Sequence, residues 1–215
     1  MHLFGGIRQV EKGGVPVFQH TQLPFRRFKS YFPVVTGILA IQTLLFLLMT
    51  ISGGSTNPLV LLRFGALENT ALLIDGEWWR LVTPVFLHIG ITHFLFNSFS
   101  LYLLGPQLEW LFGRWRFIAL YLLTGIMGNL ATVYLGEVGI SAGASGAIYG
   151  LLGVYVYLFL FRRGSMDPDT GKGLLALVGI NLVISILTPT INLTAHLGGL
   201  VAGFLLAGPL LRRKM

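Results

Sequence analysis

The sequence predicts an all-α polytopic membrane protein, with six transmembrane helices in one bundle and an interfacial outer loop between the first two helices. Three observations predict this fold class: scarce charge, abundant apolar residues and apolar stretches of spanning length. Only 11% of the 215 residues are charged, whereas soluble domains carry about 25%. Hydrophobic residues make up 54% of the chain, and the mean hydropathy is +0.76. A chain with so few solvating groups cannot cover its apolar surface in water.

Six apolar stretches are close to the length that a helix needs to cross a bilayer. The first carries no charge, the second is interrupted by two histidines and an asparagine, and the fifth is a little short. Residues 52–84 are too apolar for a solvated loop and too rich in glycine and proline to span. They predict an amphipathic element at the interface, anchored by Trp78 and Trp79. The predicted spans are residues 33–51, 85–104, 117–135, 141–161, 174–187 and 193–211.

The positions of the basic residues predict the orientation. Of the 15 Lys and Arg residues, only Arg63 and Arg80 fall on one side of these spans, and the others fall on the opposite side. The positive-inside rule therefore predicts a multi-pass cell-membrane protein with both termini cytoplasmic. The net charge of +7 follows from this topology, so no nucleic-acid partner is expected. The predicted parts are a cytoplasmic basic N-terminal tail (1–31), a six-helix membrane domain (32–211) and a cytoplasmic basic C-terminus (212–215).

Polar side chains inside three of the spans gather at one depth. The second, fourth and sixth spans each begin on the extracytoplasmic side, and their polar groups lie near that end. Polar groups within a membrane are costly and mark candidate functional sites, so a site opening to the extracytoplasmic side is predicted. The chain has no cysteine, which excludes disulfides, thiolate metal sites and a cysteine nucleophile. The candidate residues are His88, His93, Asn97, Ser145, Tyr149 and His196.

Ser145 and His196 have the chemistry of a nucleophile and its base. A serine hydroxyl becomes nucleophilic when a neighbouring base, usually histidine, accepts its proton. The two residues lie on spans that run parallel, and Gly199 and Gly203 follow His196 on the same face, where small residues permit close helix packing. No acidic residue is available at this depth, so a Ser–His dyad is predicted, with Tyr149 placed to pack against the imidazole. Plainer interpretations are a glycine-rich helix contact, a hydrogen-bonded buried histidine and an interfacial aromatic.

His93 and Asn97 are spaced i, i+4 and lie on one face of the second span. An imidazole and an amide both donate hydrogen bonds, as an oxyanion hole requires. The alternative is a metal site formed by His88, His93 and His196. It is disfavoured because no carboxylate accompanies the three histidines, and because residues five apart are about 140° from a common helix face. Neither a metal nor another cofactor is predicted.

Over residues 33–211 the chain resembles the rhomboid proteases. Several motifs in the right order and on the right spans carry this resemblance, although none would suffice alone. In chain order they are Gly-Glu-Trp-Trp-Arg at 76–80, His88, His-Phe-Leu-Phe-Asn at 93–97, Glu-Trp-Leu-Phe-Gly at 109–113, Gly-Ala-Ser-Gly-Ala-Ile-Tyr at 143–149, and Ala-His-Leu-Gly-Gly at 195–199 followed by Gly203.

The resemblance implies a serine-type endopeptidase that hydrolyses peptide bonds in or beside transmembrane segments of other membrane proteins. Its implied partners are those substrates and the lipid bilayer, and its form resembles the compact bacterial members. Ser145 is implied to attack, with His196 as base and then acid. The implied supporting residues are His93, Asn97, Tyr149 and Gly143 at the active site, and Trp79, Arg80, Glu109, Gly113, Gly199 and Gly203 in structural motifs.

The resemblance also implies a lateral opening near the fifth span, where Gly171, Gly173 and Gly179 suggest mobility. Two other function classes remain open. A non-catalytic rhomboid-like binder of membrane proteins predicts that Ser145→Ala changes nothing. A small transporter would need polar groups in the cytoplasmic halves and internal repeats, and neither is present in the sequence. The oligomeric state has no signal in the sequence.

Overall fold

The computed structural model describes residues 23–211 apart from residues 74, 137–138, 163 and 189. Its regular structure is helical, and in the described residues the extended pairing is an isolated bridge between Leu67 and Ser141. In chain order the helices are α1 (Phe25–Tyr31), α2 (Pro33–Ile51), α3 (Pro58–Arg63), α4 (Asn69–Leu73), the 3₁₀ turns η3 (Trp78–Leu81) and η4 (Thr83–Phe86), α5 (Gly90–Phe112), α6 (Arg114–Leu135), α7 (Ser145–Phe161), α8 (Pro168–Leu187) and α9 (Leu193–Leu211).

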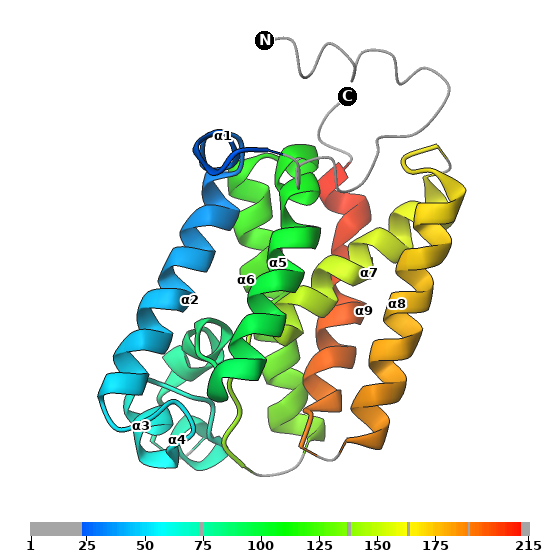
Figure 1. The fold of residues 1–215 in the computed structure, drawn as a ribbon. Helices are drawn as coiled ribbons and strands as arrows, with labels where there is room; N and C mark the ends of the chain where they lie inside the picture. The colour runs from blue at the N-terminus through cyan, green and yellow to red at the C-terminus, as the bar shows by residue number, and fades with distance from the viewer. Residues whose placement is uncertain (1–22, 74, 137–138, 163, 189, 212–215) are drawn as a thin grey trace.

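The long helices stand side by side in one bundle, with α3 and α4 gathered at one end and α1 at the other (Figure 1). By length and composition, α2, α6, α8 and α9 can each cross a membrane, and α7 is a shorter apolar helix of 17 residues. The sixth long helix, α5, has 23 residues. The predicted all-α, multi-pass membrane fold is therefore confirmed, and the first and sixth predicted spans coincide with α2 and α9.

The second and fourth spans begin later along the chain than predicted, whereas the third and fifth begin earlier, at Arg114 and Pro168. The second span was expected from residue 85, but the turn η4 occupies that region and α5 starts at Gly90, whose backbone has φ +80°. It then continues through Pro106 to Phe112, beyond the expected end. The fourth was expected from residue 141, but Ser141 is held in the bridge to Leu67. Ser145 is consequently the first residue of α7 and does not lie a turn inside it.

The fifth span, α8, is longer than predicted because it begins at Pro168. The Asp167 side chain caps this end by accepting a hydrogen bond from the Thr170 N–H at 2.9 Å. Hydrogen bonds from Thr170 lower the pKa of the Asp167 carboxyl, as expected for a carboxylate at a helix N-terminus.

Backbones of α6, α7 and α9 are in direct contact at the centre of the bundle. A Cβ added at Gly199 would collide with the carbonyl oxygen of Gly146, and one at Gly203 would collide with that of Gly150. On α6, a Cβ at Gly128 would lie 2.7 Å from the Ala195 carbonyl oxygen. Glycine is therefore required at these positions by close helix approach.

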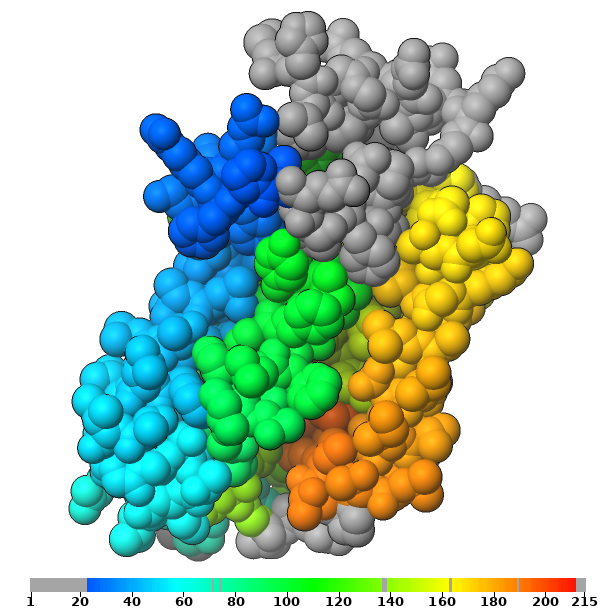
Figure 2. All heavy atoms as spheres, in the orientation of Figure 1, coloured from blue at the N-terminus to red at the C-terminus, as the bar shows by residue number. Residues whose placement is uncertain are grey.

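The remaining long helices enclose this centre unequally. Helix α2 packs on α5, whereas α8 packs mainly on α7 and more sparsely on α9. In the space-filling view, parts of α7 and α9 are visible between the green α5 and the orange α8 (Figure 2). The buried residues of α8 are Gly171, Leu174, Val178 and Ser185.

Glu109 of α5 caps the N-terminus of α2. Its two carboxylate oxygens accept hydrogen bonds from the backbone N–H groups of Val34 at 3.0 Å and Val35 at 2.8 Å. These N–H groups lie in the first turn of α2 and have no acceptor within their own helix. Gly113, four residues on, separates α5 from α6 with φ +78°. Glu109 thus joins α5 to the start of α2, and Gly113 lies at the turn between α5 and α6.

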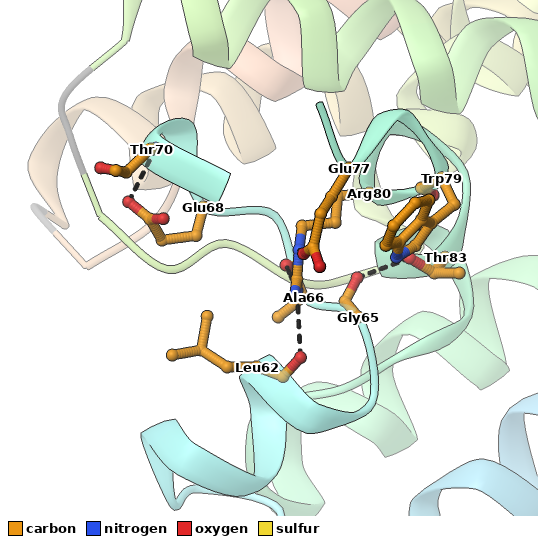
Figure 3. Close-up of polar contacts among 9 residues, drawn as sticks. All are labelled: Leu62, Gly65, Ala66, Glu68, Thr70, Glu77, Trp79, Arg80 and Thr83. Carbon is orange, nitrogen blue, oxygen red and sulfur yellow. Dashed lines mark hydrogen bonds and ion pairs between the residues drawn. The ribbon is translucent and has the colours of Figure 1, made fainter. Parts of the chain in front are cut away.

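Arg80 organises the loop between α2 and α5 (Figure 3). The guanidinium is buried, and its Nη1 donates to the carbonyl oxygens of Leu62 at 3.0 Å and Ala66 at 2.7 Å, while Nε donates to Glu77. Arg80 therefore ties α3 to η3. The side chains of Trp78 and Trp79 are more than half exposed, and the interfacial anchoring predicted for them remains a prediction.

Helix α1 occupies the last part of the predicted N-terminal tail. Phe28 is buried and its ring lies 5.3 Å from that of Phe32 and 5.1 Å from that of Tyr102 on α5. This part of the tail consequently packs on the bundle. Residues 1–22 and 212–215, which complete the predicted terminal parts, lie outside the described residues.

Candidate active site

Ser145 follows a short segment that is fixed to the loop by backbone hydrogen bonds. The Leu67 N–H donates to the Ser141 carbonyl at 2.8 Å, and the Ser141 N–H donates back at 2.9 Å. Two residues further on, the Gly143 N–H donates to the Pro84 carbonyl at 2.9 Å. Because Arg80 binds the carbonyl of Ala66, next to Leu67, the loop structure is transmitted to the residues just before Ser145.

Gly143 allows the His93 ring to approach Ser145. Its backbone has φ +153°, and an added Cβ would lie 2.6 Å from Cε1 and 2.8 Å from Nε2 of His93. The same Cβ would lie 3.6 Å from Oγ of Ser145. The Nε2 edge of His93 and the hydroxyl of Ser145 therefore flank one glycine, so any side chain at this position would fill the space between them.

The other ring nitrogen of His93 accepts a backbone hydrogen bond. The Ile89 N–H donates to Nδ1 at 3.4 Å, which places the proton of a neutral imidazole on Nε2, the edge that faces Gly143. Asn97 lies one turn later and is buried, and one hydrogen of its amide is donated to the His93 carbonyl at 2.9 Å. The second amide hydrogen of Asn97 is available for a further acceptor.

His196 lies in the first turn of α9 and stacks on Tyr149. The two rings have centroids 4.0 Å apart and an angle of 11° between their planes. Nδ1 of His196 lies 2.9 Å from Oγ of Ser185 on α8, and the Tyr149 hydroxyl lies 3.3 Å from the same oxygen. Three helices thus contribute to the surroundings of this imidazole, which is only 7% exposed.

The glycine contacts between α7 and α9 give the relative depth of Ser145 and His196. Gly199 meets Gly146 and Gly203 meets Gly150, so the register is the same at both points. By this register Ser145 lies level with Gly198, two residues from His196, a difference of about 3 Å along the helix axis. The two side chains that the sequence predicts as a dyad are therefore at the same depth on adjacent parallel helices.

Asn192, which the sequence interpretation missed, joins both sides of this arrangement. Its Oδ1 accepts a hydrogen bond from the Ala195 N–H at 2.9 Å and so caps the start of α9. Its Nδ2 donates to Oγ of Ser141 at 3.0 Å and to Oγ1 of Thr132 on α6 at 2.9 Å. An asparagine immediately before the first helical residue is a capping signal that the sequence offers. The other partners of Asn192 lie 51 and 60 residues away along the chain and have no such signal.

The sequence interpretation also missed Ser185, because a lone serine in an apolar helix is usually hydrogen-bonded to its own backbone.

His88 is fully buried, and its ring packs edge-on against His93 at 5.5 Å and Phe94 at 5.6 Å. Within the described residues, no group of three His, Cys, Asp or Glu side chains is arranged to hold a metal ion. Of the glycines expected to make α8 mobile, Gly171 packs on the Phe159 ring, whereas Gly173 and Gly179 have open space around them.

The fold and site define a helical multi-pass membrane protein in which a serine, a histidine and a second histidine with an asparagine converge at one end of the bundle. The family model of the rhomboid domain matches residues 75–213. The chain belongs to the rhomboid family.

Among its relatives in Bacillus subtilis (strain 168) is YdcA, whose descriptive name gives it as a candidate rhomboid protease. YdcA is 40% identical over 191 residues, which cover 88% of this chain and 94% of YdcA. The rhomboid protease GluP of the same organism is 42% identical over 184 residues, covering 85% of this chain but only 36% of GluP. RHOMBOID-like protein 1 of Arabidopsis thaliana is 39% identical over 153 residues, covering 70% of this chain and 39% of that protein.

Proposed function

We propose that this chain is an intramembrane serine endopeptidase that cleaves peptide bonds in or beside transmembrane segments of other membrane proteins. The observation that carries the proposal is the glycine register between α7 and α9, which brings Ser145 and His196 to one depth. Membership of a family with members named as proteases supports it. So does the presence of every residue that the family resemblance implies for the reaction.

In the proposed reaction, Nε2 of His196 accepts the proton of the Ser145 hydroxyl as Oγ attacks the scissile carbonyl carbon. The same proton then passes to the leaving amine, and water, activated by the same histidine, releases the acyl group. The stack of Tyr149 on His196 restricts rotation of the imidazole, so that the lone pair of Nε2 keeps its direction. No metal or cofactor enters these steps.

The oxyanion is proposed to be bound by His93, Asn97 and backbone N–H groups at the start of α7. The proton on Nε2 of His93 faces the space beside Ser145, as inferred from the Ile89 hydrogen bond. No side chain caps the first turn of α7, and the first N–H groups of a helix have no acceptor within it. Donors fixed in this way stabilise charge as it develops without having to reorganise.

Substrate is proposed to enter laterally beside α8, and the site is proposed to open on the extracytoplasmic side. The sparse packing of α8 on α9 and its small number of buried residues support lateral entry. A peptide bond must leave its helix to reach Ser145, so helix-weakening residues near the cleavage site are expected in substrates. Proline scanning across the scissile region of a cleaved substrate tests this, and cleavage indifferent to every proline contradicts it.

The decisive experiment is cleavage of a tagged transmembrane substrate in liposomes by the wild type, Ser145→Ala and His196→Ala. We expect product from the wild type and none from either variant, at matched thermal stability of all three. Covalent labelling of wild type by a fluorophosphonate, absent in Ser145→Ala, identifies the nucleophile without a peptide substrate. Equal product from all three proteins, or labelling that persists in Ser145→Ala, rejects the assignment. Capture of the substrate by wild type and Ser145→Ala alike, with neither cleavage nor labelling, favours the non-catalytic binder.

A further inference from the structure

Ser185 is the polar member of an otherwise apolar buried stripe on α8. In this helix, all of which is described, the buried residues are Gly171, Leu174, Val178 and Ser185. Their spacing of three, seven and fourteen residues from the first keeps them on one face. Ser185 is 4% exposed, whereas the residues on either side of it in the sequence are exposed on the outside of the bundle. The helix therefore directs one hydroxyl into the bundle, at the level of His196.

The hydrogen bonds of this hydroxyl can be assigned from its neighbours. Oγ of Ser185 lies 2.8 Å from the carbonyl oxygen of Asn181, which can only accept. The single proton of the hydroxyl is thus donated to Asn181. The same Oγ lies 2.9 Å from Nδ1 of His196 and 3.3 Å from the Tyr149 hydroxyl. With its proton committed, Ser185 must accept from both, and its two lone pairs suffice for this.

This assignment determines the tautomer of His196. If Nδ1 donates to Ser185, the neutral imidazole carries its proton on Nδ1 and has its lone pair on Nε2. The opposite tautomer would leave two lone pairs facing each other across 2.9 Å, or would require Ser185 to abandon the carbonyl of Asn181. A base that is to accept a proton through Nε2 needs the first tautomer.

We propose that Ser185 is a positioning residue for His196, which holds the base in its reactive tautomer from helix α8. This inference rests on the proposed function and names a third partner for the Ser–His pair. It offers a substitute for the missing acidic residue, because the chain from Nδ1 through Ser185 ends on the Asn181 carbonyl oxygen. Both oxygens are acceptors, and hydrogen bonds to them stabilise the imidazolium formed when Ser145 loses its proton.

The plainer alternative is that the Ser185 hydroxyl merely satisfies its own hydrogen-bonding requirement by donating to the backbone of its own helix, as buried serines in apolar helices commonly do. Thr36 on α2 provides a matched control, since its hydroxyl donates to the Phe32 carbonyl at 2.8 Å in the same i to i−4 pattern. It lies on a helix that contributes none of the candidate catalytic residues. The test compares Ser185→Ala, the conservative Ser185→Thr and the control Thr36→Val in the full chain.

The first measurement is the tautomer of His196 by NMR of protein with ¹³C,¹⁵N-labelled histidine. The chain has five histidines, and the His196 signals are assigned as those missing from His196→Gln. We expect a proton on Nδ1 in the wild type, in Ser185→Thr and in Thr36→Val, and a growing fraction of the Nε2–H form in Ser185→Ala. A wild-type His196 with its proton on Nε2 overturns the proposal, as does a tautomer unchanged in Ser185→Ala. This readout requires no activity, so it remains informative if the proposed function fails.

The second measurement is kinetic. For Ser185→Ala we expect kcat to fall by about tenfold or more with KM changed less than about twofold, because a base in the wrong tautomer acts on chemistry and not on binding. The rate of Ser145 labelling by a fluorophosphonate, which is far smaller than a transmembrane substrate, should fall in parallel. Ser185→Thr should restore both rates. Normal labelling with slow substrate cleavage in Ser185→Ala would show a role in substrate entry instead and would overturn the proposal.

Discussion

At Gly199 a single methyl group would meet the carbonyl oxygen of Gly146. The smallest possible substitution therefore tests the glycine contacts between α7 and α9, which we call the α7–α9 seam. We expect Gly199→Ala to destabilise the protein by about 1–3 kcal/mol, the usual cost of overpacking, and to reduce cleavage by moving His196 away from Ser145. Unfolding in detergent micelles measures the first effect. Gly173→Ala on α8, where an added Cβ meets nothing within 4 Å, is the control and should be neutral or stabilising. Equal losses of stability at both glycines would contradict the close packing of α7 on α9 at Gly199.

Tyr149 offers a second test at the scale of one residue. Its ring stacks on His196, while its hydroxyl makes only a long contact of 3.3 Å with Ser185. Tyr149→Phe is therefore expected to retain most of kcat. Tyr149→Leu is expected to lower kcat by about 2- to 12-fold, which corresponds to the ~0.5–1.5 kcal/mol of an aromatic stack. Steady-state cleavage kinetics separate the two, and a larger loss in Phe than in Leu would show that the hydroxyl matters more than the ring.

The sequence predicted the candidate catalytic residues, but not the residues that hydrogen-bond to them or to the segment before Ser145. His93, Asn97, Tyr149 and His196 stand out because a polar group within a membrane needs an explanation. Ser185 and Asn192 are short and common, and each acts through partners that are distant in sequence. No periodicity or spacing could identify those partners, because they depend on how α8 and α9 pack.

Among the elements, Glu109 is the clearest case of one helix completing another. Its carboxylate accepts the Val34 and Val35 N–H groups and is nearly fully buried. We expect Glu109→Ala to lower stability by about 1–3 kcal/mol for each of these charged hydrogen bonds, with Glu109→Gln intermediate because it retains one acceptor. Thermal unfolding in micelles measures this. Cleavage per folded molecule should be unchanged at low temperature, and a specific loss of kcat would contradict a purely structural role.

Asn192 allows its two functions to be separated by substitution. Asn192→Asp retains the acceptor that caps α9 but loses the donors to Ser141 and Thr132, whereas Asn192→Ala loses both. We expect Asp to preserve most of the stability and to lower kcat. We expect Ala to lower kcat similarly and to lower stability by a further ~1 kcal/mol, the energy of the lost cap. Stability and kcat measured on the same preparations separate the effect of the α9 cap from that of the contact with Ser141. Full activity in Asn192→Asp would mean that the contact with Ser141 does not position the nucleophile.

Helix existence was predictable from hydropathy, whereas helix starts were not. The spans that became α2 and α9 are bounded by proline or by polar loops and were predicted with their exact ends. The start of α7 depends on tertiary contacts, because the residues just before Ser145 bond to the outer loop. The start of α5 depends on the turn η4 and on the positive φ of Gly90, although the residues before Gly90 are as apolar as a helix. A sequence window cannot distinguish an apolar extended segment from an apolar helical turn.

For the molecule as a whole, the orientation in the bilayer remains a prediction from the basic residues. The chain has no cysteine, so single cysteines can be introduced at exposed positions at either end of the bundle. We expect Ser52→Cys, at the end of α2, to react with a membrane-impermeant thiol reagent on intact cells. Asp169→Cys, in the first turn of α8, should react only after permeabilisation. The reverse pattern would invert the predicted topology and place the candidate site on the cytoplasmic side.

The seam between α7 and α9 joins helices that are made at different times during translation. Ser145 leaves the ribosome before His196, with one further membrane helix, α8, inserted between them. Until α9 enters the bilayer and meets Gly146 and Gly150, Ser145 lacks its proposed base and the loop before it lacks the Asn192 contact. Under the proposed chemistry a nascent chain is therefore harmless to the proteins that share its insertion site. Activity arises only when the last of the described helices is in place.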